Sequence, residues 1–204
     1  MSRKMIFATG NEGKMREIRM IMEDMDAEIV SMKEAGISAD IVEDGSSFEE
    51  NALIKARAVA DRAPEDAIVL ADDSGLEIDY LNKEPGIYSA RYLGENTSYR
   101  VKNAELLRRL QGVPKEKRTA RFVCAVAAVI PKEGGGREEA VVRGVIEGYI
   151  GQEERGENGF GYDPIFYVEE YGCSTAEMEE SLKNRISHRG NALRLMRERL
   201  AGLL

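Results

Sequence analysis

Residues 9–14 read Thr-Gly-Asn-Glu-Gly-Lys and combine residue types that bind phosphate. The segment lies between an apolar strand candidate and a helical pattern. Gly10 and Gly13 allow a tight turn, the first turn of a helix presents unpaired N–H groups, and Lys14 adds positive charge at the same place. The spacing is not that of the P-loop, which has four residues between its first glycine and its Gly-Lys pair and then Ser or Thr. The segment predicts an anion-binding turn, with a connecting turn that has no chemistry as the alternative.

Acidic residues supply candidate metal ligands. Residues 72–75, Asp-Asp-Ser-Gly, are predicted to form a turn between two short strands, where one or both carboxylates can project into a cleft. The same tetrapeptide is also a good turn sequence without any chemistry. Magnesium binds hard oxygen ligands, usually one or two carboxylates with waters and substrate phosphates, and Glu43 with Asp73 would provide them. Glu49 and Glu50 open a predicted helix, and at least one of them is interpreted as a solvated residue that the helix dipole favours there.

Basic residues that could neutralise an anionic ligand include Lys14, Lys55 and the run 183–189 near the C-terminus. This run holds the only histidine of the chain, His188, beside Arg189 at the predicted start of the last helix, so several donors converge at a helix N-terminus. A single histidine more often has a structural role, and it cannot form a metal site alone. The chain has no Ser-His-Asp or Cys-His spacing that would indicate an acyl-enzyme.

A glycine-rich loop carries two aromatic residues, Phe160 and Tyr162. Their rings could offer a face to a flat ligand. They could equally anchor the loop to the core, and the residues alone leave both interpretations open.

Composition limits the class of protein. The 204 residues carry a net charge of −8, which disfavours a nucleic-acid partner and means that an anionic small molecule would need local cations or a metal. Cys124 and Cys173 are too few and too far apart for a disulfide framework or a zinc cluster and are predicted to be reduced core thiols. No segment resembles a signal peptide or approaches 18 consecutive apolar residues, so we expect a cytoplasmic protein without a membrane partner. Because domains usually contain roughly 100 to 200 residues, a chain of 204 residues is expected to form a single domain over residues 1–204 or two closely merged lobes.

The pattern of elements predicts an α/β fold. Apolar stripes and capping signals predict helices after residue 14, over 47–63, over 99–111 and from residue 175 onward. Strands are predicted over 5–8, 27–32, 67–71, 76–80, 120–130, 139–150 and 165–168. The two longest are joined across three glycines and predict an antiparallel hairpin, which argues against a purely parallel doubly wound sheet. We expect a mixed central sheet flanked by helices.

Six motifs, taken in order, resemble the inosine triphosphate pyrophosphatase family, the non-canonical purine nucleoside triphosphate pyrophosphatases. They span nearly the whole chain, and their order and spacing are too specific for chance. No motif position departs from the family pattern. The motifs are Thr9-Gly10-Asn11-x-x-Lys14, Phe48-x-Glu50-Asn51-Ala52-x-x-Lys55-Ala56, Ala71-Asp72-Asp73-Ser74-Gly75-Leu76, Pro85-Gly86-Ile87-Tyr88-Ser89-Ala90-Arg91-Tyr92, Phe160-Gly161-Tyr162-Asp163-Pro164 and Ile186-Ser187-His188-Arg189.

The resemblance implies an activity and an architecture. The activity is a Mg²⁺-dependent hydrolysis of ITP, dITP and XTP between the α- and β-phosphates, which releases a nucleoside monophosphate and pyrophosphate and cleanses the nucleotide pool. The architecture is an elongated α/β fold with a central mixed β-sheet flanked by helices and two lobes with a cleft between them. Members of the family are typically homodimers.

The same resemblance implies roles for individual residues. Glu43 and Asp73 would bind the metal, and Asp73 would also be the general base. Lys55 would neutralise phosphate charge. The triphosphate would be held by Thr9, Gly10, Asn11, Glu12, Gly13 and Lys14. Phe160 and Tyr162 would pack near the purine, Ser74 and Gly161 are counted with the substrate-binding residues, and Asp163, Lys183, His188 and Arg189 would position the base and its 6-oxo group.

The resemblance also raises the question of how the protein would distinguish one purine base from another. We hypothesise that donors from His188 and Arg189 meet the purine O6, so that the amino group of adenine would leave a buried donor facing a donor. Guanine also has a 6-oxo group, so the exclusion of guanine must come from the 2-position of the purine by means that the sequence does not reveal.

Two alternative functions remain for the chain. One is a pyrophosphatase that acts on another altered nucleotide or on a pyrimidine nucleotide. The other is a binding or regulatory module that holds purine nucleotides without hydrolysing them.

Overall fold

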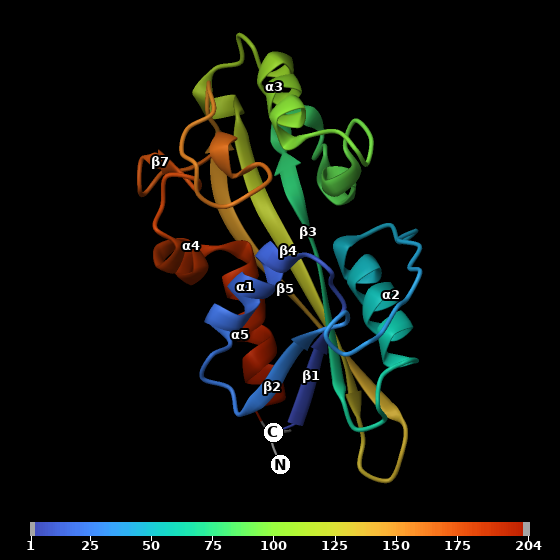
Figure 1. Ribbon diagram of the computed structural model, residues 1–204. Coiled ribbons are helices and arrows are strands. Elements are labelled where there is room, and N and C mark those ends of the chain that lie inside the picture. The colour runs from blue at the N-terminus through green and yellow to red at the C-terminus, as the bar shows by residue number, and fades with distance from the viewer. Residues whose placement is uncertain (1–2, 202–204) are drawn as a thin grey trace. The chain divides into compact units, whose positions relative to one another are not determined.

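The computed structural model describes residues 3–201 as an α/β structure around a seven-stranded sheet (Figure 1). The strand order is β2-β1-β3-β4-β5-β6-β7. The strands are β1 (Arg3–Phe7), β2 (Ala27–Ser31), β3 (Ile68–Ile78), β4 (Thr119–Pro131), β5 (Arg137–Ile150), β6 (Phe166–Val168) and β7 (Cys173–Ser174). The α-helices are α1 (Glu12–Ile21), α2 (Phe48–Ala60), α3 (Tyr99–Arg109), α4 (Glu180–Ile186) and α5 (His188–Leu200).

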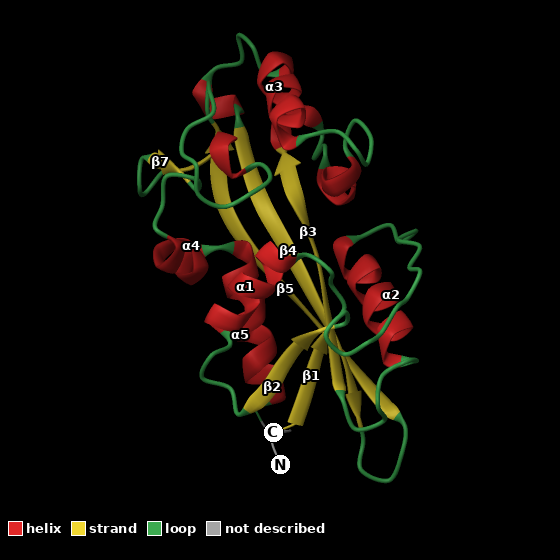
Figure 2. Ribbon diagram, viewed as in Figure 1, coloured by secondary structure: helices red, strands yellow, loops and turns green. Residues whose placement is uncertain are grey.

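Strand directions confirm the predicted mixed sheet. β1 pairs in parallel with both β2 and β3, whereas β6 pairs antiparallel with β5 and with β7. β4 and β5 are neighbours joined by the predicted glycine turn, which is closed by a hydrogen bond from the Lys132 N–H to the Gly136 carbonyl. Helices flank the strands, as Figure 2 shows.

The chain forms two compact units. Within the described residues, the first contains 3–73, 124–144 and 189–201, and the second contains 74–123 and 145–188. The single domain and the cleft between two lobes stay predictions.

In the first unit, helices cover both faces of the strands. Met5 and Phe7 of β1 point to one face and pack with apolar side chains of α1 and α5 in a common buried core. Ile6 and Val69 point to the other face and are also buried, as are Phe48, Ala52, Ala56, Val59 and Ala60 of α2. In Figure 1, α2 accordingly lies on the opposite side of these strands from α1 and α5. Of the apolar stripe predicted over Met15, Ile18, Met22 and Met25, the first three residues are confirmed as buried core, whereas Met25 lies beyond the end of α1 and is only partly buried.

The second unit has its own core, formed around α3 by the end of β3, the start of β4 and the end of β5. Leu76 and Ile78 of β3 are fully buried there, and the rings of Phe122 and Phe166 lie 4.4 Å apart between centroids. The buried Arg118 guanidinium donates hydrogen bonds to the carbonyl oxygens of Leu110, Ile150 and Gly151. This side chain therefore ties the end of α3 to the end of β5.

The predicted turn at residues 72–75 is wrong, because β3 runs without interruption from Ile68 to Ile78. Polar and small residues favour turns only when no tertiary contact opposes them. Here Leu76 and Ile78 are fully buried beyond residues 72–75, so the burial of their side chains in an extended strand outweighs the local preference for a turn. An uninterrupted strand places the side chains of Asp72 and Asp73 on opposite faces of the sheet.

The C-terminal helical region also differs from its prediction. Residues 175–179 are not helical, and two helices follow, α4 and α5. Ser187 separates them with an extended backbone, φ −67° and ψ 157°. None of the helices among residues 3–201 combines the length and the apolar character that a membrane span requires.

The two cysteines in the described residues are both free thiols. Cys124 is fully buried, and burial together with the charge of Asp72 raises the pKa of its thiol to about 12. The predicted core thiol is thus confirmed for Cys124. Cys173 is only partly buried, because it lies in the two-residue strand β7 at the edge of the sheet.

Candidate functional site

The turn before α1 has the geometry of a helix cap. Asn11 is the N-cap residue, and its side-chain oxygen accepts a hydrogen bond from the Lys14 N–H at 3.1 Å. Thr9 Oγ1 accepts a hydrogen bond from the Asn11 N–H, also at 3.1 Å. A Cβ atom added to Gly10 would meet no other atom within 4 Å, so the space beside the turn is open. Residues 9–14 therefore form the predicted turn at a helix N-terminus, with room for a ligand.

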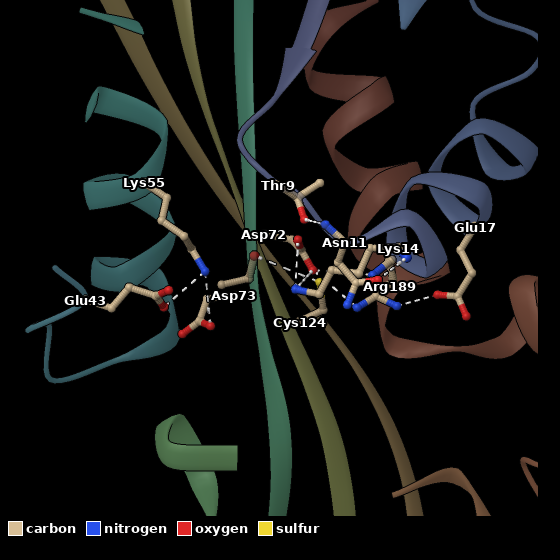
Figure 3. A network of polar contacts seen from close by, with 11 residues as sticks. Thr9, Asn11, Lys14, Glu17, Glu43, Lys55, Asp72, Asp73, Cys124 and Arg189 are labelled. Atoms are coloured by element: carbon tan, nitrogen blue, oxygen red, sulfur yellow. Dashed lines mark hydrogen bonds and ion pairs between the residues drawn. The ribbon is translucent and has the colours of Figure 1, made fainter. Parts of the chain in front are cut away.

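Asp72 lies at the centre of a buried charge network on the α1 and α5 side of β3 (Figure 3). Lys14 Nζ lies 3.0 Å from Asp72 Oδ2, and the Arg189 guanidinium contacts both Asp72, at 3.3 Å, and Glu17. Only 2% of Arg189 and 3% of Asp72 is exposed. Burial alone would raise the pKa of Asp72, but Lys14 and Arg189 outweigh it and hold that pKa well below its usual value. Asp72 is therefore a fully compensated anion.

Asp73 points to the opposite face of β3, toward α2 (Figure 3). Lys55 Nζ lies 3.4 Å from Asp73 Oδ1 and 3.2 Å from Glu43 Oε2, so one ammonium bridges both carboxylates. The Asn51 amide donates a hydrogen bond to Asp73 Oδ2 at 3.2 Å. Burial and the nearby charge of Glu43 raise the pKa of Asp73 despite the opposing effect of Lys55. The pKa of Asp72 is thus lowered, whereas the pKa of its neighbour Asp73 is raised.

The Glu43 and Asp73 pair fits a magnesium ion chemically. The two carboxylates converge on the Lys55 ammonium, at 3.2 Å from Glu43 and 3.4 Å from Asp73, so their oxygens lie close enough to supply the hard ligands that Mg²⁺ prefers. Among the residues that the structure describes, no group of three or more His, Cys, Asp and Glu side chains could hold a metal. The other ligands would then be waters and substrate oxygens, which is the usual pattern for Mg²⁺.

The second unit gathers another set of predicted residues around Asp163. This carboxylate accepts hydrogen bonds from Lys183 Nζ at 2.7 Å, from the Phe160 N–H at 2.8 Å and from Thr175 Oγ1 at 2.8 Å. Lys183 Nζ also lies 5.2 Å from the centre of the Phe160 ring, a cation–π distance. Asp163 and Lys183 are both buried, whereas 39% of Phe160 is exposed. The buried ion pair therefore supports an accessible aromatic ring.

Tyr162, by contrast, anchors the loop to the core. Its hydroxyl donates to the Ser89 carbonyl at 2.6 Å, and its ring meets the Tyr99 ring edge to face at 5.2 Å. Burial raises the pKa of this hydroxyl, and only 4% of the residue is exposed. Gly161 lies against the Tyr99 ring at a φ of +71°. Of the two interpretations of these aromatics, the anchor holds for Tyr162, and a ligand-facing ring stays a prediction for Phe160.

The predicted site residues are divided between the two units of the chain. His188 is buried and stacks on Phe122 with ring centroids 4.9 Å apart. Ser74 is half-buried within β3. Lys14, Lys55, Glu43 and Asp73 belong to the first unit, whereas Phe160, Tyr162, Asp163, Lys183 and His188 belong to the second. A common substrate for both groups stays a prediction.

Three residues that contact the predicted ones have no role assigned from the sequence. Asn51 belongs to a motif, but its bond to Asp73 has no local signal because the two residues lie 22 positions apart. Glu17 lies one helical turn after Lys14, a spacing that could have indicated a shared helix face. Gly159 precedes the aromatic loop and contacts the Asp163–Lys183 pair.

Gly159→Ala is expected to destabilise the loop beyond the cost of its backbone conformation. Gly159 has a φ of +76°, and a Cβ there would lie 2.3 Å from Asp163 Oδ2 and 2.8 Å from Lys183 Nζ. The left-handed backbone alone costs about 1–2 kcal/mol for a residue with a Cβ, and displacement of the ion pair adds to it. Urea unfolding measures the loss. Gly172→Ala is the matched control, since Gly172 has a φ of +61° but open space around it, and equal losses in both variants would contradict the prediction.

Curated proteins and solved structures similar to this chain identify its family. A curated relative from Caldanaerobacter subterraneus subsp. tengcongensis, named dITP/XTP pyrophosphatase, is 47% identical over 96% of this chain and 94% of its own. A Ham1 protein structure from Staphylococcus aureus is 40% identical, covers 99% of this chain and 100% of its own, and superposes with a TM-score of 0.86. A structure from Mycobacterium abscessus titled nucleoside-triphosphatase / dITP/XTP pyrophosphatase is 39% identical, covers 95% of this chain and 98% of its own, and has a TM-score of 0.72. These relatives confirm the resemblance to the pyrophosphatase family, and because the model of the Ham1 family matches residues 5–199, the chain belongs to the Ham1 family.

Proposed function

We propose that this chain is a Mg²⁺-dependent pyrophosphohydrolase of non-canonical purine nucleoside triphosphates, ITP, dITP and XTP. A water molecule adds to phosphorus, the bridging P–O bond between the α- and β-phosphates breaks, and a nucleoside monophosphate and pyrophosphate leave. The enzyme class, a nucleoside triphosphate pyrophosphatase, follows from the curated relatives. The observation that carries the proposal is the bridged pair of Glu43 and Asp73 in the same unit as the turn of Lys14.

The acidic side of the site would hold the cation. Glu43 and Asp73 are the residues that would bind Mg²⁺, which when bound would neutralise phosphate oxygens as charge develops on them. Lys55 pairs with both carboxylates and so holds them close together. The Asp73 carboxylate would also accept a hydrogen bond from a water molecule and orient that water for attack.

The basic side of the site would hold the triphosphate. The open turn of residues 9–14 offers backbone N–H groups and the partial positive charge of the α1 N-terminus. Lys14 adds a full charge whose position is fixed by Asp72. Phosphoryl transfer depends on positioning and charge neutralisation more than on covalent help, so these groups are sufficient for the proposed reaction.

The residues that the resemblance assigns to the purine include Phe160, Lys183 and His188 of the second unit. The exposed ring of Phe160 is available for stacking, and Lys183 lies beside it as a candidate donor to an oxo group. His188 and Arg189 keep their proposed role toward O6. In the structure the Arg189 guanidinium contacts Asp72 and Glu17. Because Asp72 also pairs with Lys14, replacement of Arg189 would change both the proposed contact with O6 and the surroundings of Lys14. A homodimer, a cytoplasmic location and a role in cleansing the nucleotide pool belong to the same proposal and rest on the resemblance.

A panel of nucleotides, assayed with and without Mg²⁺ and with separate detection of pyrophosphate and phosphate, tests the proposal. We expect pyrophosphate from ITP, dITP and XTP only in the presence of the cation, with kcat/KM for ATP and GTP lower by a factor of about 10² or more. His188→Ala should narrow the preference for ITP over ATP. Release of phosphate instead of pyrophosphate, or equal activity on ATP, would overturn the proposal.

A further inference from the structure

Asn51 is a fully buried polar residue near the start of α2, with no exposed surface. Asparagine is a poor helix former, so its presence in a buried helical position calls for a physical reason. Its amide contacts partners on both sides. The nitrogen Nδ2 donates to Asp73 Oδ2 at 3.2 Å, and the oxygen Oδ1 accepts from the Gly45 N–H at 2.9 Å.

The Gly45 contact fixes the segment that carries Glu43. Gly45 lies two residues after Glu43, and a Cβ at Gly45 would be 2.7 Å from Asn51 Oδ1 and 2.8 Å from Glu50 Cβ. The backbone therefore approaches α2 so closely that only glycine fits. Ser46 strengthens the attachment, because its N–H and hydroxyl both donate to the Glu50 carboxylate, at 2.7 and 2.8 Å.

The Asp73 contact fixes the orientation of the carboxylate. Asn51 holds Oδ2 and Lys55 holds Oδ1, so rotation of the carboxylate would break one hydrogen bond or the other. Each carboxylate oxygen has about two acceptor positions, and one on each oxygen stays available for a cation or a water.

We propose that Asn51 is a positioning residue for the hydrolytic reaction, whose single amide sets both the orientation of Asp73 and the position of the Glu43 segment so that the two carboxylates bind one divalent cation together. An amide suits this task because it donates on one side and accepts on the other, whereas a carboxylate could only accept. The inference rests on the proposed function and adds to it a residue that touches neither cation nor substrate. Groups that orient metal ligands in this way typically contribute about 10- to 100-fold to metal affinity or activity.

The test measures cation binding as well as catalysis. Mn²⁺ affinity is measured by water-proton relaxation in the presence of an α,β-methylene analogue of dITP, which cannot be cleaved at the proposed bond. For Asn51→Ala we expect the Mn²⁺ Kd to rise about tenfold or more and kcat to fall by a similar factor. The KM for dITP should change little, because Lys14 and its turn do not contact Asn51. Asn51→Ser, whose hydroxyl is too short to reach both partners, is expected to give the same result and serves as the second variant if Asn51→Ala does not fold.

Ser47→Ala is the matched control for loss of stability. Ser47 caps the same helix by accepting the Glu50 N–H at 3.1 Å, so its removal destabilises α2 without altering the Asn51 amide. We expect this variant to melt at a lower temperature with wild-type Mn²⁺ affinity and kcat. If the Asn51 variants keep wild-type Mn²⁺ affinity and kcat, or change them no more than Ser47→Ala does, the inference is wrong while the proposed function stands. If the wild-type protein itself fails to bind Mn²⁺ with the analogue, the proposed function fails and this inference fails with it.

Discussion

Asp73→Asn is expected to lower kcat/KM for dITP and XTP by a factor of about 10³, within the range found when a general base is removed. The substitution preserves the size of the side chain and leaves Lys55 paired with Glu43, so the fold should persist. It removes the Asp73 carboxylate, whose pKa is raised by burial and by the charge of Glu43, and with it the acceptor that would orient water and one of the two proposed cation ligands.

Steady-state kinetics and nucleotide binding measured separately decide this prediction. A catalytic role requires that turnover be lost while the uncleavable dITP analogue still binds, because Lys14 and the turn of residues 9–14 are unchanged. Turnover within tenfold of the wild-type value would contradict it. Loss of binding and turnover together, in a folded protein, would place Asp73 in substrate binding instead.

Asp72→Asn is expected to lower the free energy of unfolding by about 3 kcal/mol or more, because removing one partner of a buried ion pair leaves an uncompensated charge. Lys14 and Arg189 would then have only Glu17 as a carboxylate within the network, and Arg189 is almost fully buried. The same variant should raise the KM for the nucleotide, since Asp72 also fixes Lys14. Chemical denaturation with urea measures the stability change.

Asp61→Asn is the surface control for that measurement. Asp61 pairs with Arg137, and both side chains are substantially exposed, so we expect a loss of less than about 1 kcal/mol. If Asp72→Asn also lost so little, the buried network would contribute little to folding, and its stabilising role would be refuted.

The capped turn before α1 and the apolar core of the first unit could be predicted from the sequence, because both depend on local patterns. Asn11 has the residue type and position of an N-cap, and Met15, Ile18 and Met22 repeat at helical spacing. The mixed sheet followed from the long hairpin. Each of these signals lies within a short stretch of chain.

The separation of Asp72 from Asp73 could not be predicted, because it depends on the strand that contains them. Asp-Asp-Ser-Gly has the composition of a turn, yet the burial of Leu76 and Ile78 keeps β3 extended through it. Only then do the two carboxylates point to opposite faces, one toward Arg189 and the other toward Lys55. The different surroundings of the two aspartates are thus a property of the sheet.

The burial of Arg189 could not be predicted from the sequence either. Its partners Asp72 and Glu17 lie 117 and 172 positions earlier in the chain, and no local pattern relates them. From sequence, Arg189 is simply a basic residue beside a histidine at a helix start. The structure shows that its guanidinium completes the network that positions Lys14.

A crystal grown with Mn²⁺ and the α,β-methylene analogue of dITP, and measured at a wavelength where manganese scatters anomalously, provides the most direct test. We predict an anomalous peak within coordination distance of both Glu43 and Asp73, with the triphosphate oxygens reaching from that ion to Lys14 and the turn of residues 9–14. A peak bound elsewhere, or a triphosphate that leaves the turn empty, would contradict the proposed site.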